Sequence, residues 1–421
     1  MSNKEFDIVI FGAASFVGKI LCDYLVNEYT EPNLSWAMAG RSESKLDQLK
    51  LSLGSTAATI PTLIADSTDI ESLNSMCARA EVIISTVGPY ALYGENLIQV
   101  CAQSGTDYCD LTGEPQWIRL MIERYEEAAK NSGARIVHSC GFDSIPSDLG
   151  VKYLQQVSKD RFGVYCDQVK MRVKKMKGGA SGGTIASGLN LYKEAAKDAQ
   201  LRKEMRDPYS ICPADHEFTA RQHNVDVELD TDFDSWAGPF IMASINTRIV
   251  LRSNALVENF YDENFLYNEA MLTGPDRKGE KKAKQLSFGT KWGAIAMAIG
   301  PIRWLVSALF LPKPGEGPSP EQQRNGHYDL GFLGRTKDGS EVRVKLTGDR
   351  DPGYGSTAKM LAQAGISLHR DVDKGSIGGG FWTPATVFGD KLIERLQSHA
   401  GMSFELVSVS KAEPSADEEK V

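Results

Sequence analysis

The sequence predicts an α/β protein in which an N-terminal Rossmann domain, a doubly wound parallel sheet, precedes a second α+β domain with a mixed sheet. Three observations predict this fold. Short β-rich runs alternate with helical patterns from Asp7 to Gly141, a turn of small residues follows the first run, and longer strands begin after Leu149. A chain of 421 residues is also long enough for two domains that each bury a core.

The predicted first domain, residues 1–149, alternates strands with helices, as is typical of a parallel sheet covered on both faces. The strands are Asp7–Phe11, Ser35–Ala39, Thr62–Ala65, Val82–Val87, Asp107–Leu111 and Arg135–Ser139. The helices are Phe16–Glu28, Ser42–Leu53, Ile70–Ala80, Glu95–Ser104 and Gln116–Asn131.

The predicted second domain, residues 150–380, carries an apolar helical insertion with a Pro-rich loop at 255–325. A C-terminal helix within 381–410 is expected to return to the Rossmann domain, and the acidic tail 411–421 is expected to be flexible. In the second domain we predict the strands Val164–Met176 and Ile245–Ser253 and a hairpin across Tyr328–Leu346. The segment Pro312–Gly326 is rich in Pro and Gly and is predicted to be irregular.

Composition disfavours several kinds of protein. The formal net charge is −8, and no block of Lys and Arg is large enough to bind a nucleic acid. The seven cysteines form no C-x-x-C pair and have no His at metal-ligand spacing, which predicts reduced thiols and no metal site. The N-terminus has no long apolar segment of the kind that export requires. We therefore expect a cytoplasmic protein that acts on a small organic substrate.

The turn after the first strand has the composition of a phosphate-binding turn. It reads Gly12-Ala13-Ala14-Ser15-Phe16-Val17-Gly18 and leads into a helical run. Small residues let the backbone pass close to a pyrophosphate, whose charge meets the unpaired N–H groups of the helix N-terminus. Because the spacing is G-x-x-S-x-x-G and not G-x-G-x-x-G, a plain tight turn is the alternative interpretation.

The end of the second strand indicates which dinucleotide binds. Gly40-Arg41-Ser42 lies just over 20 residues after Gly18, where an NAD-specific site carries an acid for the ribose 2′-hydroxyl. Arg41 can instead bind a 2′-phosphate with Ser42 beside it, so NADP(H) is the predicted cofactor. Alternatively, Arg41 is a surface residue and Ser42 caps a helix. Asp66, which ends the third strand, is placed to receive the adenine amino group.

Six segments resemble the saccharopine dehydrogenase-like family, and specifically its trans-acting enoyl reductase branch. They are Gly12–Gly18 with Ala39-Gly40-Arg41-Ser42, Asp107–Glu114, Gly141–Asp148, Gly182-Gly183-Thr184, Asp351–Ala358 and Gly379–Pro384. They are spread in order over both predicted domains, and Ser15 departs from the family pattern, which usually has Gly there. The resemblance implies NADPH-dependent reduction of a carbon–carbon double bond in a lipid or polyketide-type acyl chain.

Hydride addition to an activated alkene leaves an enolate, which needs hydrogen-bond donors at its carbonyl and a proton donor at carbon. In open α/β sheets, ligands lie beyond the carboxyl ends of the strands. The candidate catalytic residues there are Tyr90, Tyr108, Asp110 and Asp143, with Glu114 and Ser144 nearby. The turn that contains Thr86, Gly88 and Pro89 is expected beside the nicotinamide. The alternative is that these acids only form turns and helix caps.

Other polar features have structural alternatives. His138 lies between apolar neighbours in the sixth strand and is interpreted as a core histidine. Ser181-Gly182-Gly183-Thr184 either presents helix amides to a ligand or forms a turn. Tyr354, between two glycines, is ranked below Tyr90 as a site residue. No G-x-S-x-G elbow surrounds Ser144, which disfavours serine hydrolysis.

The stretch Trp292–Leu311 is almost entirely apolar and follows a basic cluster at 277–284. Gly300-Pro301 interrupts the stretch and Arg303 lies within it, so a transmembrane helix is disfavoured. We expect it to contact lipid, as a peripheral anchor on the inner face of the membrane or as a lid over the substrate. A buried core helix is the alternative.

Three functions are therefore considered. The first is an NADP-dependent enoyl reductase that acts on a lipid-like substrate. Such an enzyme could act as a homodimer. The second is a saccharopine dehydrogenase-like enzyme acting on an amino-acid-derived C–N bond, although the scattered Arg residues of the second domain announce no carboxylate clamp. The third is a membrane-associated protein that binds NADP(H) without turnover.

Overall fold

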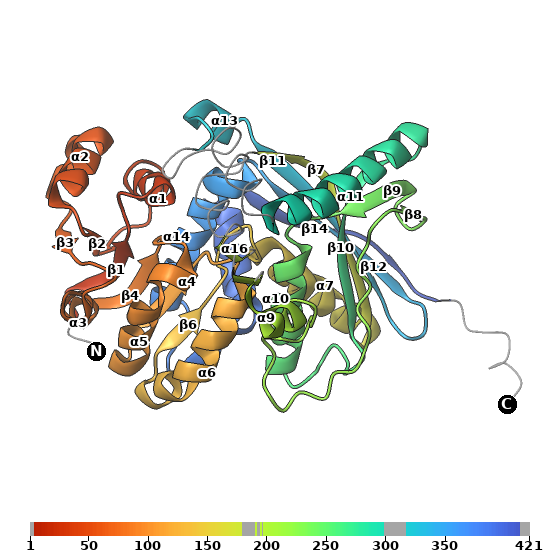
Figure 1. Ribbon diagram of the computed structural model, residues 1–421, viewed down its shortest axis with the longest axis horizontal. Coiled ribbons are helices and arrows are strands. Elements are labelled where there is room, and N and C mark those ends of the chain that lie inside the picture. The colour runs from red at the N-terminus through yellow and green to blue at the C-terminus, as the bar shows by residue number, and fades with distance from the viewer. Residues whose placement is uncertain (1–3, 179–189, 192–193, 196, 299–316, 413–421) are drawn as a thin grey trace, which may run out of the picture.

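The computed structural model describes residues 4–178, 190–191, 194–195, 197–298 and 317–412. Within these residues the chain forms two seven-stranded sheets, and Figure 1 shows them side by side, most of the first in red to yellow and most of the second in green and blue. One cluster of buried apolar side chains includes Ile8 and Ile10 of the first sheet and Val169 and Phe332 of the second. The two sheets therefore share a core.

The first sheet is parallel throughout and has the order β13-β6-β5-β4-β1-β2-β3. Its strands are β1 (Phe6–Phe11), β2 (Trp36–Gly40), β3 (Thr62–Ile64), β4 (Ala80–Ser85), β5 (Asp107–Asp110), β6 (Arg135–Val137) and β13 (Gly380–Trp382). The predicted doubly wound sheet is confirmed. Since the strand order reverses between β1 and β4, a crevice for a ligand is expected at the carboxyl ends of these two strands.

The five predicted helices of this domain are all present. They are α1 (Phe16–Asn27), α2 (Glu43–Leu53), α3 (Ile70–Arg79), α5 (Glu95–Ser104) and α6 (Pro115–Ser132), accompanied by the short helices η1 (Ser55–Thr59) and α4 (Tyr90–Tyr93). α6 ends at Gly133, whose φ of 82° is the left-handed conformation that ends many helices.

The C-terminal part of the chain returns to the first sheet. α14 (Thr357–Arg370) is buried along almost its whole length and packs against α1, β1, β4 and β5. The helix predicted within 381–410 is present as α16 (Asp390–His399), which packs on α14. The range also holds the end of β13, α15 (Pro384–Val387) and β14 (Met402–Ser410), which the prediction missed. A strand as short as β13 is too short for hydrophobic periodicity to reveal.

The second sheet is mixed, as predicted, and has the order β14-β12-β11-β7-β10-β9-β8. Its remaining strands are β7 (Gln168–Lys177), β8 (Glu228–Asp230), β9 (Ser235–Pro239), β10 (Leu266–Gly274), β11 (His327–Arg335) and β12 (Glu341–Gly348). The predicted hairpin is confirmed as β11 and β12, which turn at Gly339 with a φ of 89°. α7 (Ile145–Phe162) leads from the first sheet to the second and packs on β11 and β12.

Two predictions for the second domain are wrong. Ile245–Ser253 lies in α10 (Ala243–Leu256) and is not a strand. This helix is buried on all sides, and its polar residues find partners inside: Arg252 donates to the carbonyl oxygens of Ile211 and Phe381. An amphipathic period is therefore missing from its sequence. The range 255–325, expected to be a helical insertion, contains β10 in the second sheet.

The apolar stretch Trp292–Leu311 is described only to residue 298, as the end of α11 (Arg277–Ala298), which packs on β9 and β10. The stretch predicted to be irregular is described only from residue 317, and there it contains the short helix α13 (Pro320–Arg324) capped by Ser319. No helix within the described ranges is long and apolar enough to cross a membrane.

Candidate active site

The turn between β1 and α1 can exist only with small residues. Gly12 has a φ of 86°, and a Cβ there would lie 2.7 Å from Thr86 Oγ1 and from Val87 Cγ2. A Cβ on Gly18 would lie 2.2 Å from the carbonyl oxygen of Gly12. Ala14 is partly exposed at this turn. The backbone at Gly12 and Gly18 is therefore packed too closely for a side chain, while the turn between them is partly exposed, as a pyrophosphate-binding turn requires.

Ser15 explains how the turn tolerates a residue other than Gly. Its Oγ accepts a hydrogen bond from Gly18 N at 2.9 Å, which caps α1, and lies 2.9 Å from Thr86 Oγ1. The N–H groups of Phe16 and Val17, the first two helical residues, have no partner within the helix. These two amides fit a bound phosphate, and the partly exposed turn leaves room for one.

Arg41 and Asp66 follow β2 and β3 at the same edge of the sheet. The exposed Arg41 has no hydrogen bond or ion pair with any described residue, so its guanidinium is available to a phosphate. Ser42 caps α2 by accepting from Lys45 N at 3.4 Å. Asp66 Oδ1 accepts from the N–H and hydroxyl of Thr68, and these bonds, with a smaller effect of Arg41, lower the pKa of Asp66. The adenine contact of Asp66 stays a prediction.

The turn Gly88-Pro89-Tyr90 begins α4 and folds inward. The Tyr90 hydroxyl donates to Ser85 O at 3.0 Å and accepts from Leu111 N at 3.4 Å. Glu114 holds the same turn, because its two carboxylate oxygens accept from Tyr90 N at 2.9 Å and Ala91 N at 3.0 Å. Burial raises the pKa of Tyr90 well above its ordinary value. The two hydrogen bonds of the Glu114 carboxylate favour the interpretation that Glu114 caps the start of α4 and is not a catalytic acid.

Asp110 is fully buried and accepts four hydrogen bonds. Its donors are Thr112 N at 3.0 Å, Ser139 N at 3.2 Å, the Tyr108 hydroxyl at 3.0 Å and His138 Nδ1 at 2.8 Å. Ser139 has a φ of 60°, a strained conformation for a residue with a side chain. Asp110 therefore ties the loops after β5 and β6 together at the carboxyl edge of the sheet.

Asp143 is the candidate that keeps its carboxyl group unbound. It is partly exposed, lies beside Gly113, and makes no side-chain hydrogen bond to another described residue. A Cβ on Gly113 would lie 3.7 Å from Asp143 Oδ1, so glycine leaves space above this carboxyl. The surrounding protein, and secondarily the charge of Asp110, raise the pKa of Asp143 to about 7. Asp143 can therefore hold a proton near neutral pH.

His138 is interpreted as a core residue, and its packing agrees. Its ring lies 5.0 Å from that of Trp117 and 5.6 Å from that of Phe381, and it is 3% exposed. Its Nε2 is buried and has no hydrogen-bond partner in the part of the chain that the structure describes. Ser144 donates to Asn246 Oδ1 at 3.2 Å and is buried, so it is not a nucleophile facing a cleft.

Sequence reasoning missed the role of Asp148. Its oxygens accept from the Ser253 hydroxyl at 2.6 Å and from Ala385 N at 2.7 Å, which joins α7, α10 and α15. Burial raises its pKa to about 7. Its membership of the segment Gly141–Asp148 was the only available signal. Gly182, Gly183 and Thr184 lie outside the described residues.

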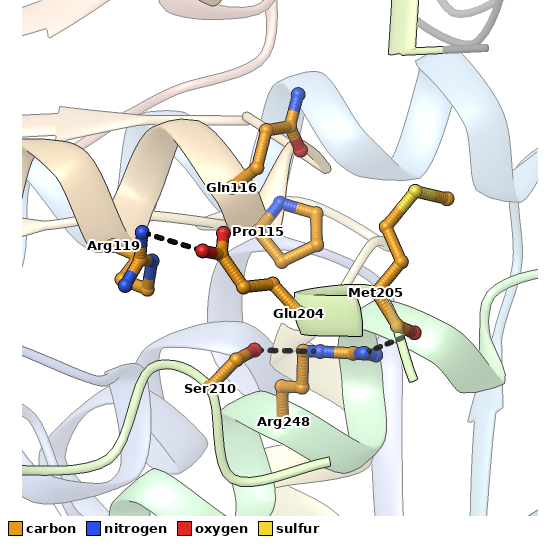
Figure 2. Close-up of a pocket in the computed structure, with 7 residues that line it drawn as sticks. All are labelled: Pro115, Gln116, Arg119, Glu204, Met205, Ser210 and Arg248. Atoms are coloured by element: carbon orange, nitrogen blue, oxygen red, sulfur yellow. Dashed lines mark hydrogen bonds and ion pairs between the residues drawn. The ribbon is translucent and has the colours of Figure 1, made fainter. Parts of the chain in front are cut away.

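A small pocket lies next to this site, where the start of α6 meets α9 (Ala199–Glu204) and α10. Figure 2 shows Arg119 paired with Glu204 and Arg248 bonded to Ser210. The two N–O distances are 3.0 Å and 3.1 Å. Its volume of about 10 Å³ accommodates one water molecule at most. The pocket is part of the joint between the helices and is too small for an acyl chain.

Known proteins resemble this chain over its whole length. Residues 8–137 match the saccharopine dehydrogenase NADP-binding domain. A protein of Mycobacterium tuberculosis provisionally named a trans-acting enoyl reductase is 39% identical over 415 residues, which is 96% of this chain and 97% of that one. The trans-acting enoyl reductase of Mycobacterium bovis is 37% identical over 412 residues, with 94% and 96% covered.

A solved structure supports the fold. The apo saccharopine dehydrogenase (L-Glu forming) from Saccharomyces cerevisiae covers 96% of this chain and 100% of its own, with a TM-score of 0.53 and 12% identity. At this identity the likeness concerns the fold alone. The sequence relatives and the matched domain decide the family. The chain belongs to the trans-acting enoyl reductase family and is an NADP-dependent oxidoreductase whose first domain is of the saccharopine dehydrogenase type.

Proposed function

We propose that this protein uses NADPH to reduce the carbon–carbon double bond of an α,β-unsaturated acyl thioester of the lipid or polyketide type. The observation that carries the proposal is the identity of 37–39% with relatives that bear the name trans-acting enoyl reductase and are covered almost completely. The site geometry supports it, because a carboxyl group that holds a proton near neutral pH lies at the carboxyl edge of the sheet.

The residues at the first βα turn fit an NADP diphosphate. Gly12 and Gly18 let the turn pack closely against its neighbours, because no side chain separates them. The N–H groups of Phe16 and Val17 have no hydrogen-bond partner within α1. Arg41 would hold the 2′-phosphate. When bound, NADPH supplies the hydride that adds to the carbon β to the thioester carbonyl.

We assign the proton to Asp143. Its carboxylic acid would donate to the α-carbon, so that the double bond gains one hydride and one proton. The carboxylate that remains regains a proton from water before the next turnover. Asp110 is less suited, because four hydrogen bonds already occupy its oxygens. The hydroxyls of Tyr90 and Tyr108 are likewise used inside the fold and act as supports.

The test supplies NADPH and a trans-2-octenoyl pantetheine thioester, and follows NADPH oxidation together with the mass of the product. Gain of two hydrogen atoms by the acyl chain is the expected result. Oxidation of saccharopine with NADP⁺ instead would favour chemistry on a C–N bond. Tight NADPH binding with turnover of neither compound would favour a binding protein without catalysis.

We also propose that the C-terminal half of α11 touches a lipid surface, which would make the protein peripheral on the inner face of the membrane. Phe288 and Trp292 are 63% and 55% exposed on successive turns, with ring centroids 5.7 Å apart. Lys281 and Lys282 are exposed on the same helix and suit anionic headgroups.

Co-sedimentation with vesicles that contain anionic phospholipid tests this contact. We expect the unmodified protein to sediment and Phe288→Asp/Trp292→Asp to stay in solution. Leu51→Asp, which alters an 81% exposed apolar residue on α2, is the matched control and should still sediment. An unmodified protein that ignores these vesicles would refute the proposal.

A further inference from the structure

The segment from Asp351 to Thr357 lies where the two sheets meet and holds its own backbone rigidly. Its helix η2 (Pro352–Ser356) leads directly into α14. The fully buried carboxylate of Asp351 accepts from the N–H groups of Gly353 at 3.2 Å, Tyr354 at 3.2 Å and Gly355 at 2.8 Å. A segment fixed in this way can transmit position, because its backbone has little freedom to adjust.

One side of the segment contacts the cofactor turn. The Tyr354 ring, 2% exposed, meets the Phe16 ring edge-on, with centroids 5.1 Å apart and planes at 81°. Gly317 also lies close to the Phe16 ring, since a Cβ there would lie 2.4 Å from Phe16 Cζ. Phe16 is the first residue of α1, and its N–H is one of the two amides assigned to the diphosphate. The placement of this amide therefore depends on Tyr354.

The other end of the segment contacts the loop that carries Asp143. Phe142 N donates to Thr357 Oγ1 at 2.9 Å, and the same hydroxyl donates to Pro352 O at 2.8 Å. The Phe142 ring packs at 4.9 Å against Tyr328, whose hydroxyl lies 2.9 Å from Ser356 Oγ. The residue before Asp143 is thus bonded to this segment directly through its backbone N–H and indirectly through the ring of Tyr328.

We propose that the Asp351–Thr357 segment is a positioning element which sets the cofactor turn through Tyr354 and the Asp143 loop through Thr357, so that the hydride and the proton reach the same double bond. Tyr354 and Thr357 are positioning residues, because each acts through a neighbour. The Thr357 contact rests on the proposed role of Asp143, whereas the Tyr354 contact depends only on NADPH binding.

Two pairs of variants separate the contacts. Tyr354→Leu removes the ring and Tyr354→Phe keeps it; Thr357→Val removes the hydroxyl and Thr357→Ser keeps it. We expect Tyr354→Leu to raise the Kd of NADPH about tenfold, the loss expected for an aromatic pair, and Tyr354→Phe to stay near the unmodified value. We expect Thr357→Val to leave that Kd within about twofold and to speed hydrogen exchange at the Phe142 amide about tenfold or more.

Turnover of the octenoyl thioester supplies a further measurement. Thr357→Val should lower kcat about 10- to 100-fold, and Thr357→Ser should restore it. The proposal is overturned if Tyr354→Leu binds NADPH normally, or if Thr357→Val leaves the exchange of Phe142 unchanged. A fully active Asp143→Asn, with the binding and exchange results as expected, would refute the role of Asp143 and leave the positioning intact. Thermal unfolding of each conservative variant confirms that its fold is preserved.

Discussion

The loop after β5 and the loop after β6 each place an aspartate at the carboxyl edge of the first sheet, and the two carboxyl groups have opposite surroundings. Asp110 accepts four hydrogen bonds and is fully buried. Asp143 accepts none from other described residues and is partly exposed. Asp148, with two donors, is intermediate. The hydrogen bonds of Asp110 hold the two loops together, whereas the Asp143 side chain makes none to other described residues, which is why we propose Asp143 and not Asp110 as the proton donor.

The same contrast recurs at the cofactor edge. Asp66 is bonded to Thr68, whereas the exposed Arg41 has no partner among the described residues. In each pair the two residues end or follow strands at the same edge of the sheet, and they differ in how many hydrogen bonds their side chains make to the described residues. The comparison predicts which substitutions damage the fold and which damage only function.

The largest effect on stability is expected from Asp110→Ala. It leaves the donors of Thr112, Ser139 and Tyr108 buried without an acceptor, and we expect the free energy of unfolding to fall by about 3–5 kcal/mol. Denaturant unfolding measures this. Asp143→Ala is the matched control and should lose less than about 1 kcal/mol. Equal losses would remove the distinction between the two loops.

Asp143→Asn should damage catalysis and spare the fold. An amide cannot replace the acid as proton donor, so kcat should fall about 100- to 1000-fold while the Kd of NADPH is unchanged. Steady-state kinetics with the octenoyl thioester and a cofactor titration give both values. A variant with normal kcat would show that another group supplies the proton.

Arg41→Ala should weaken NADPH binding by about 1.5–3 kcal/mol and leave NADH binding unchanged, because only NADPH carries the 2′-phosphate. Fluorescence titration of both cofactors measures this preference. Lys50→Ala, in the last turn of α2, is the control for loss of a positive charge and should bind NADPH normally. Equal affinity of the unmodified protein for the two cofactors would contradict the assignment of Arg41.

The pH dependence of turnover should follow the protonation of Asp143. Its pKa is raised to about 7, and only the protonated acid can donate, so kcat should fall about tenfold per pH unit above that value. The fall should be absent from the residual activity of Asp143→Asn. A rate that increases through this range would indicate a general base instead.

The last prediction concerns Asp148 and the pH dependence of stability. Its pKa is about 7 in the folded protein and 3.8 ordinarily, so the unfolded chain releases this proton first. The folded state therefore loses stability as the pH rises from about 4 to about 7. Asp148→Asn should flatten the pH dependence of the free energy of unfolding in that window. An unchanged slope would show that other groups account for it.

The sequence by itself determined the doubly wound sheet, the tight turn Gly12–Gly18 and the position of Arg41. These features depend on neighbours in the chain: alternating apolar runs, the Gly12–Gly18 spacing and the residue that follows β2. The hairpin of β11 and β12 was predictable for the same reason, since its turn is local.

Only the tertiary structure decided which acids are structural and which elements complete the first sheet. The donors of Asp110 come from residues up to 29 positions away, and Thr357 reaches Phe142 across 215 positions. α10 was misread as a strand because burial on every side removes the polar face by which a helix is recognised. The pattern of apolar and polar residues shows which face of one helix or strand is buried. It does not show which distant residues meet in the interior, where the contacts of Asp110, Thr357 and α10 lie.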